Sequence, residues 1–265
     1  IAIIEVGMGG RLDATNILNP EVSIITNIGL DHTKFLGDNL SDIAFEKAGI
    51  IKQDTPVVIG ETKKETKLVF QKKASEMSAP IIFSDSEKID HYNSDLKGIV
   101  QKKNIRTVVS ALKFLKNYKI TKKNITDGLL NVLKNTSFKG RWQVVKKNPL
   151  IIFDLAHNVE AMTYVVNQLS EFSSKELHLV LGFVGDKPVS EIINLFPLDS
   201  KFYFSSPMLE RAFPLNDLER LGQKLNLNFN IYPSVLKAFE SAKNIAEKND
   251  IIFVGGSTFV LSEIL

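Results

Sequence analysis

The sequence predicts an α/β fold with mostly parallel sheets and helices on both faces, arranged as two domains. Apolar segments of strand length alternate with helical stretches along the chain, which is typical of βαβ units. A polar stretch at residues 84–96 interrupts this alternation, and a second series starts after Asn135, Thr136 and Ser137. We therefore expect one domain over residues 1–136 and a second over residues 137–265.

Short apolar runs bounded by turn residues predict buried strands, and amphipathic spacing predicts helices. In the first series the predicted strands are residues 1–5, 22–28, 56–60 and 80–83, and the predicted helices are residues 64–77, 98–118 and 122–133, the last capped by Thr121. In the second series the predicted strands are residues 150–153, 177–181, 201–204 and 251–254, with helices near residues 159–171 and 235–247. A further short helix carries Lys47, with Ser41 or Asp42 at its start and Gly49 at its end.

Composition narrows the class of protein. The chain has 265 residues, 44% of them hydrophobic, which is long enough for two ordinary domains. It has no cysteine, which excludes disulfides and thiolate metal sites. The net charge of +3 comes from scattered lysines without an arginine cluster, so we expect no nucleic-acid partner. No apolar run approaches the roughly 20 residues of a membrane span and no signal peptide pattern opens the chain, so we expect a cytoplasmic protein with no membrane partner.

The segment E-V-G-M-G-G-R-L-D-A-T-N, residues 5–16, directly follows the first predicted strand. It places Glu5 at the carboxyl end of that strand, the edge where open α/β sheets bind ligands. His32 follows the second predicted strand in the same way, so we expect the two side chains to lie side by side. A carboxylate and an imidazole, completed by water and nucleotide phosphate, make a workable Mg²⁺ shell, although imidazole is an unusual ligand for this ion. A zinc site on His32 is the competing interpretation, but the sequence offers no second histidine or cysteine nearby.

The glycines of this segment favour a tight turn that lets the backbone approach phosphate closely. A dinucleotide-binding fingerprint is not favoured, because G-x-G-G lacks the third glycine that opens a helix. Arg11 and Asp13 are expected to pair and brace the turn. His91 and His178 have no comparable context and are expected to be ordinary surface or core residues.

Five segments, in order, resemble those of the Mur ligase superfamily, most closely its folate branch, the folylpolyglutamate synthases and dihydrofolate synthases. They are residues 5–16, T-N-I-G-L-D-H at 26–32, F-E-K-A-G-I at 45–50, G-R-W-Q at 140–143 and D-L-A-H-N at 154–158. The resemblance implies an incomplete Mur-ligase-type central ATPase domain followed by a smaller Rossmann-like, glutamate-binding C-terminal domain. The family's phosphate-binding loop precedes the Glu5 strand, but no G-x-x-x-x-G-K-[ST] pattern occurs here. We therefore expect a fragment that lacks the P-loop region and is inactive alone.

The resemblance also assigns a metal site. Glu5 and His32 match the family residues that hold magnesium. Lys47 matches a catalytic lysine that is N6-carboxylated and helps to hold a second magnesium ion, whereas its local sequence alone is typical of a solvated helix lysine. Carboxylation requires a neutral amine, and burial can lower the pKa of a lysine enough to supply one.

Nucleotide contacts are implied in the same way. Asn104 completes G-x-x-Q-x-x-N at residues 98–104 and matches an adenine contact, for which an amide offers both a donor and an acceptor. Arg141 matches an arginine that reaches the nucleotide phosphates. Asp154 matches a further nucleotide contact.

Residues after the strands of the second series are expected to meet glutamate. His157 matches a catalytic residue close to the incoming amino acid and the reacting phosphate, and Ser257 is a candidate for the glutamate carboxylate. Asp186, in Gly-Asp-Lys-Pro, also echoes a family segment. The usual family form at 154–159 is D-G-A-H-N-P, so Leu155 puts the backbone geometry of that turn in question, since a glycine there can adopt a positive φ.

Together these features imply an ATP-dependent amide ligase that adds L-glutamate to a folate, to dihydropteroate, or to both, through an acyl-phosphate intermediate. ATP, Mg²⁺, L-glutamate and the acceptor are the expected ligands, and a monomer is the expected state. Two alternatives stay open. One is a peptidoglycan-precursor Mur ligase, which shares the magnesium and lysine residues, and the other is a catalytically inactive nucleotide-binding fragment.

Overall fold

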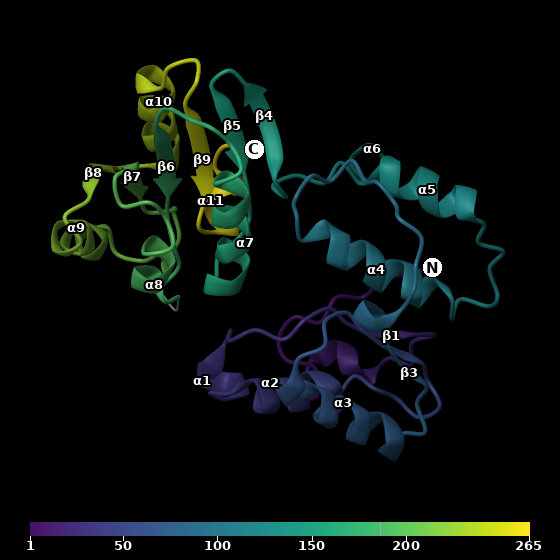
Figure 1. The fold of residues 1–265 in the computed structure, drawn as a ribbon. Coiled ribbons are helices and arrows are strands. Elements are labelled where there is room, and N and C mark those ends of the chain that lie inside the picture. The colour runs from purple at the N-terminus through teal and green to yellow at the C-terminus, as the bar shows by residue number, and fades with distance from the viewer. Residues whose placement is uncertain (186) are drawn as a thin grey trace. The chain divides into compact units, whose positions relative to one another are not determined.

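The computed structural model describes residues 1–185 and 187–265, which form two compact units (Figure 1). The first unit comprises Ile1–Ser94 and Val100–Asn131, and the second comprises Asp95–Ile99 and Val132–Leu265. The chain therefore enters the second unit twice, first as a five-residue segment. This division differs from the predicted boundary at residue 136 by including residues 132–136 and 95–99 in the second unit. Asp186 lies outside the described residues.

The first unit is built on a three-stranded parallel sheet in the order β1-β2-β3. Buried Ile25, Val57 and Ile59 pack against Ile43 and Phe70 of the helices on one face. The strands are β1 (Ser23–Ile25), β2 (Val57–Ile59) and β3 (Ile81–Phe83); the helices are α1 (Thr33–Leu36), α2 (Leu40–Ala48), α3 (Lys64–Glu76), α4 (Gln101–Leu112) and α5 (Lys122–Leu130), with 3₁₀ turns η1 (Ala14–Ile17) and η2 (Ser84–Ser86). The strands predicted at 22–28, 56–60 and 80–83 are confirmed, with shorter bounds.

Capping residues explain where two of these helices begin. Thr121 accepts a hydrogen bond from the backbone N–H of Asn124, whose side chain accepts one from Thr121 in return, which confirms the predicted cap of α5. Helix α2 begins after Asn39, whose side chain accepts from the N–H of Asp42, so the predicted start at Ser41 or Asp42 is wrong by two or three residues. Gly49 ends α2, as predicted.

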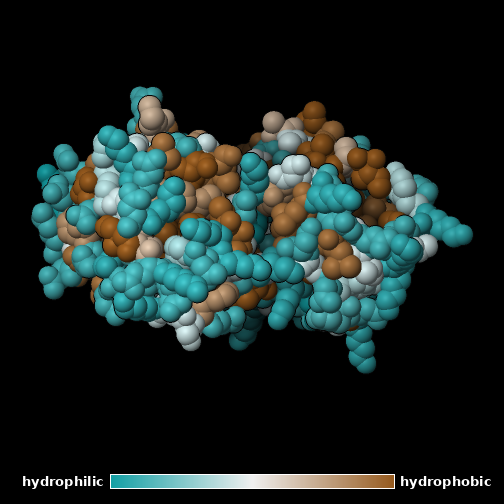
Figure 2. Space-filling view, turned by 90° about the horizontal axis from the view of Figure 1, so that it is seen from above, coloured by the Kyte–Doolittle hydropathy of each residue, from teal (hydrophilic) through white to brown (hydrophobic). Residues whose placement is uncertain are grey.

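The predicted strand at residues 1–5 is wrong. This segment has no regular secondary structure, and Ile1, Ile3 and Ile4 are 81%, 95% and 54% exposed. A strand forms only where a neighbouring strand accepts and donates its backbone hydrogen bonds, and no strand among the described residues pairs with this segment. Exposed hydrophobic residues also occur elsewhere on the chain: the face drawn in Figure 2 shows them interspersed with hydrophilic ones.

The second unit holds a six-stranded sheet in the order β4-β5-β9-β6-β7-β8. All neighbouring pairs are parallel except β4 with β5. The strands are β4 (Gln143–Lys147), β5 (Leu150–Phe153), β6 (Leu177–Leu181), β7 (Lys201–Ser205), β8 (Asn228–Tyr232) and β9 (Ile251–Gly255); the helices are α6 (Val132–Thr136), α7 (Val159–Leu169), α8 (Val189–Ile193), α9 (Leu215–Lys224), α10 (Val235–Ile245) and α11 (Thr258–Ser262).

Alternate residues of these strands supply two cores, one on each face of the sheet. Ile152 and Phe253 pack in one core with residues of α7, α8 and α9. Ile151 and Ile252 pack in the other with residues of α10 and α11. Helices on both faces of a largely parallel sheet confirm the predicted α/β class. No helix among the described residues is long and apolar enough to cross a membrane.

Candidate active site

The glycine-rich turn of the first unit is held by the carboxylate of Asp13. Oδ2 accepts the N–H groups of Gly7 and Met8 at 3.1 and 3.0 Å, and Oδ1 accepts the N–H and hydroxyl of Thr15 at 3.0 and 2.6 Å. The side-chain hydrogen bond from Thr15, followed by the backbone N–H groups, lowers the pKa of Asp13 to about 2. The carboxylate therefore stays ionised and fixes the backbone of the turn.

Arg11 does not pair with Asp13, so that prediction is wrong. Its guanidinium donates to the carboxylate of Glu46 on α2, with Nε 3.2 Å from both carboxylate oxygens and Nη2 2.9 Å from Oε1. The Arg11 N–H also donates to the Glu46 carbonyl at 2.8 Å. A Cβ at Gly49 would overlap the Arg11 backbone, so only glycine allows this close approach. The glycine-rich turn is thus attached to the end of α2 that carries Lys47.

Lys47 lies half-buried in the last turn of α2. Burial lowers the pKa of its amine, and the charge of Asp31 opposes that shift. A lowered pKa increases the neutral fraction of the amine, the form that reacts with carbon dioxide. The environment of Lys47 therefore differs from that of an ordinary solvated lysine.

Glu5 and His32 both have exposed side chains. Glu5 lies in the segment without secondary structure that leads into the glycine-rich turn. His32 precedes α1 in the left-handed conformation, with φ 51°, and its N–H donates to the Asp31 side chain at 2.8 Å. Neither residue directly follows a strand of the observed sheet, because β1 ends at Ile25. The magnesium assignment of Glu5 and His32 stays a prediction.

Asn104 lies in the first turns of α4, partly buried. Its side-chain N–H donates to the Gln101 side chain at 3.0 Å. Gln101 therefore fixes the orientation of the Asn104 amide, so the two polar residues at the start of this helix act together.

Parallel strands of the second unit bring three turns to the carboxyl edge of its sheet. Asp154 follows β5, and Gly255–Ser257 follows the neighbouring β9, where the Asp154 N–H donates to the Val254 carbonyl at 3.1 Å. The turn before β4, which carries Arg141, joins them because the Leu155 N–H donates to the Gly140 carbonyl at 2.8 Å. The two ends of the β4–β5 hairpin thus meet the turn after β9, about 100 residues further along the chain, at the edge where this type of sheet binds ligands.

Asp154 is the most deeply buried charged residue of this edge, 7% exposed. Its Oδ2 accepts the Trp142 N–H at 2.7 Å, and its Oδ1 accepts the Ala156 N–H at 2.8 Å. Burial raises the pKa of Asp154 above its ordinary value, in opposition to these two N–H groups and to the charge of Arg141. Arg141 itself has an exposed side chain.

His157 and Ser257 lie at the starts of the helices that follow β5 and β9. The Nδ1 atom of His157 is 3.1 Å from the Leu155 carbonyl, which orients the imidazole. Ser257 is 2% exposed and caps α11, with Oγ accepting the Phe259 N–H at 3.2 Å. The question raised by Leu155 has an answer here: Leu155 is not among the residues with positive φ, and Gly140 takes that conformation instead, with φ 76°.

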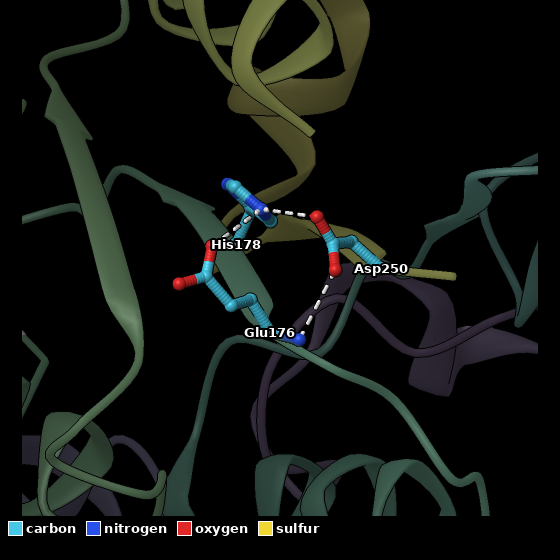
Figure 3. Close-up of side chains that lie close together, drawn as sticks. All are labelled: Glu176, His178 and Asp250. Atoms are coloured by element: carbon cyan, nitrogen blue, oxygen red, sulfur yellow. Dashed lines mark hydrogen bonds and ion pairs between the residues drawn. The ribbon is translucent and has the colours of Figure 1, made fainter. Parts of the chain in front are cut away.

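The opposite, amino edge of the same sheet holds a polar cluster that the sequence analysis did not identify. Within the described residues, Glu176, His178 and Asp250 form one group whose possible ligand atoms all lie within 4.8 Å of one another (Figure 3). His178 Nε2 is 3.4 Å from Asp250 Oδ2, and Nδ1 is 2.9 Å from the Tyr203 hydroxyl. His178 is fully buried, as a core histidine, in the strand L-H-L-V-L, which is otherwise apolar.

The protonation states of this cluster favour a structural network over a metal site. Burial lowers the pKa of His178 and raises that of Tyr203 to about 12. Burial also opposes ionisation of Asp250, but hydrogen bonds from the Glu247 N–H and from His178 outweigh it and lower that pKa. An ionised Asp250 can only accept, so Nε2 carries the proton of the neutral imidazole and Nδ1 accepts from Tyr203.

Lys201 completes the charge balance of the cluster. Its Nζ is 2.5 Å from Oε2 of Glu176. A cation therefore already contacts the most exposed carboxylate of the group, and the imidazole nitrogen nearest both carboxylates is protonated. This arrangement satisfies the side chains without an added ion.

Comparison with known proteins gives matches in both units. Residues 1–130 match the model of the Mur ligase middle domain, and residues 140–258 match the Mur ligase, glutamate ligase domain. A dihydrofolate synthase/folylpolyglutamate synthase of Buchnera aphidicola subsp. Schizaphis graminum is 31% identical over 281 residues, which cover 100% of this chain and 65% of that protein.

Solved structures of similar proteins share the fold. Escherichia coli FolC in complex with DHPP and ADP has a TM-score of 0.84 at 27% identity, over 98% of this chain and 64% of that one. A bifunctional folylpolyglutamate synthase/dihydrofolate synthase from Yersinia pestis complexed with AMPPNP and Mn ion has a TM-score of 0.83 at 26% identity, over 98% and 64%. The chain thus spans slightly less than two thirds of the length of these proteins.

Proposed function

Because the chain belongs to the Mur ligase family, as its ordered motifs predict, we propose that it forms part of an ATP-dependent amide ligase that adds L-glutamate to a folate, to dihydropteroate, or to both. The unit that matches the glutamate ligase domain would receive the amino acid. The cytoplasmic location and the monomeric state stay predictions of the sequence.

One observation carries the proposal. Three segments, residues 140–143, 154–158 and 255–257, carry residues that the sequence analysis linked to nucleotide and glutamate. They meet at the carboxyl edge of one largely parallel sheet through the hydrogen bonds of Leu155 with Gly140 and of Asp154 with Val254. Independent motifs of a structural protein have no reason to converge on one ligand-binding edge.

The reaction we propose has two steps. A carboxylate oxygen of the acceptor attacks the γ-phosphorus of ATP, ADP leaves, and an acyl phosphate forms. The amine of L-glutamate then attacks the acyl carbon, inorganic phosphate leaves, and an amide bond forms. Arg141, with an exposed guanidinium, is suited to hold phosphate oxygens during the first step, and Asn104 is suited to the adenine edge.

His157 and Ser257 are the residues we assign to glutamate. The Leu155 carbonyl fixes the ring of His157, so the imidazole can orient the incoming amino acid beside the reacting phosphate. The Ser257 hydroxyl accepts from Phe259 and keeps its own proton to donate to a carboxylate.

Divalent metal is part of the proposal, because a relative binds AMPPNP together with Mn. We assign Mg²⁺ to Glu5, His32 and an N6-carboxylated Lys47. The donor chemistry fits: a carboxylate and a carbamate supply the oxygens that Mg²⁺ prefers, while the imidazole is the less usual ligand. The lowered pKa of Lys47 fits an amine that must be neutral to take up carbon dioxide. When bound, the ion would offset the negative charge of ATP and the acceptor carboxylate.

The function is tested by product analysis with protein expressed from its complete gene. With ATP, Mg²⁺ and L-glutamate present, we expect ADP to form only when a folate or dihydropteroate is added, and the acceptor to gain the mass of one glutamyl residue. Turnover with a uridine-linked peptidoglycan precursor instead would identify the other Mur ligase activity. Binding of ADP without turnover on any acceptor would identify the inactive nucleotide-binding protein.

The lysine assignment is tested by Lys47→Ala in the same protein. We expect turnover to fall at least about 100-fold, the usual scale for losing a charge-stabilising catalytic group, and a short carboxylic acid in the assay to restore part of it by replacing the carbamate. The neighbouring Lys52, which donates to the Asn16 carbonyl at 2.5 Å, provides the control, since Lys52→Ala removes a nearby lysine without this role. Rescue by a short amine would show that the positive charge mattered.

A further inference from the structure

The turn that carries Arg141 has an unusual backbone. Gly140 and Trp142, the residues on either side of Arg141, both have positive φ, 76° and 45°. A glycine adopts this conformation readily, whereas a bulky aromatic residue resists it. Trp142 therefore keeps this backbone only because its surroundings hold it there.

Two contacts hold Trp142. Its indole is buried, 4% exposed, in the core beneath the sheet and lies 6.3 Å from the ring of Phe172. Its backbone N–H donates to Oδ2 of Asp154 at 2.7 Å, a short hydrogen bond to an acceptor that is itself buried. The other oxygen of Asp154 accepts the Ala156 N–H at 2.8 Å. One carboxylate thus joins the turn of Arg141 to the turn of His157.

The geometry requires a carboxylate rather than an amide. Both oxygens of Asp154 face backbone N–H donors, and a side-chain amide would turn its NH₂ group toward one of them. A second hydrogen bond joins the same two turns in the opposite direction: the Leu155 N–H donates to the Gly140 carbonyl at 2.8 Å. The two turns are tightly packed: a Cβ at Gly140 would lie only 2.8 Å from Leu155 Cγ, so a larger residue at position 140 would push them apart.

We propose that Asp154 is a positioning residue that sets the direction of Arg141 through the N–H of Trp142. This inference rests on the proposed function in one respect, the role of Arg141 at the nucleotide phosphates. It differs from a direct contact between Asp154 and the nucleotide, because it predicts that the Arg141 turn changes in the absence of any nucleotide when Asp154 is altered.

The chain offers a direct probe, because Trp142 is its only tryptophan. Protein labelled with nitrogen-15 tryptophan gives one backbone amide resonance, which needs no further assignment. The matched variants are Asp154→Asn and Asp250→Asn. Asp250 is a second buried aspartate that also accepts two backbone N–H groups in the same unit, but at the other edge of the sheet. ADP affinity is measured in parallel for these variants, for Arg141→Gln and for the double variant Asp154→Asn/Arg141→Gln.

We expect Asp154→Asn to shift the Trp142 amide resonance upfield and to weaken ADP binding about tenfold, the scale of one lost charge-assisted contact. Asp250→Asn should change neither. The double variant should bind ADP no more weakly than Arg141→Gln alone, because both changes remove the same interaction. If Asp154→Asn fails to fold, titration of the parent protein gives the second test: the Trp142 resonance should move as the Asp154 carboxylate takes up a proton.

Three results would overturn the proposal. An unchanged Trp142 resonance with weaker ADP binding would make Asp154 a direct nucleotide contact. A shifted resonance with unchanged ADP affinity would show that Arg141 does not depend on this connection. Unchanged ADP affinity in Arg141→Gln would remove the nucleotide role of Arg141 and so the function proposed for it, while the resonance would still report whether Asp154 holds the turn.

Discussion

Asp154 and Asp250 lie at opposite edges of the same six-stranded sheet, and each buried carboxylate accepts two backbone N–H groups. Burial prevails at Asp154 and raises its pKa, whereas at Asp250 the hydrogen bonds from the Glu247 N–H and from His178 prevail and lower it. The partners also differ: Asp250 has an imidazole at 3.4 Å, whereas the charge that acts on Asp154 is that of Arg141.

This contrast separates an edge whose polar network stabilises the fold from the edge to which we assign ligand binding. A carboxylate whose pKa is raised in the fold costs stability when it ionises, so a protein gains nothing from that charge unless the site uses it. The carboxyl edge also holds positive φ at Trp142, a second form of strain, of a kind that clusters at functional sites. At the amino edge, Lys201 and Tyr203 complete the network around His178.

The largest effect on this comparison is expected from His178→Leu. The change leaves the Tyr203 hydroxyl and one side of the Asp250 carboxylate without their buried partner, which costs about 2–3 kcal/mol of unfolding free energy. Urea unfolding followed by Trp142 fluorescence measures it. The affinity for ADP should stay within about twofold of the parent value, since this edge lies opposite the one to which we assign ligand binding.

Tyr203→Phe is the matched control, because it removes only the hydroxyl that donates to His178. We expect a smaller loss of about 1 kcal/mol, and the double variant should be less destabilised than the sum of the two single changes. A His178→Leu protein as stable as the parent but unable to bind ADP would reverse the roles assigned to the two edges.

Much of the fold follows from the sequence because the central strands are apolar and short. The runs at 150–153, 177–181 and 251–254 are buried on both faces of the sheet. A continuous apolar run is therefore enough to predict each of these strands. Edge strands are harder. β4 reads Q-V-V-K-K and β8 reads N-F-N-I-Y, and both lie at the margins of the sheet, where one side is solvated and the apolar signal is weak.

Two of the errors share one physical cause, which is that partners distant in sequence decide the outcome. Residues 1–4 are as apolar as any core strand, yet without a neighbouring strand they stay exposed. Arg11 has an acid two residues away, but its partner is Glu46 on α2. The motifs identified Arg141, Asp154 and His157 as a set, whereas the N–H of Trp142 that connects two of them is a backbone group, which no side-chain pattern reveals.

The smallest effect, and the sharpest test of the comparison, is the pH dependence of Asp154→Asn and Asp250→Asn. The raised pKa of Asp154 means that the folded state binds this proton more readily than the unfolded state, so the parent gains stability as the pH falls through the folded pKa toward the unfolded value of 3.8. Asparagine does not titrate, so the stability of Asp154→Asn relative to the parent should fall as the pH is lowered from about 7 to about 4.

The sign is opposite for Asp250. Its lowered pKa gives the parent stability that is fully present above the unfolded value of 3.8 and is lost as the pH falls through the folded pKa. Asp250→Asn should therefore be about 1 kcal/mol less stable than the parent at about pH 7 and should approach it below about pH 4. Urea unfolding at about pH 7, 5 and 3.5 provides both curves. If the stability of both variants relative to the parent changed with pH in the same direction, the comparison would fail. The local partners of the two aspartates would then not set opposite pKa shifts.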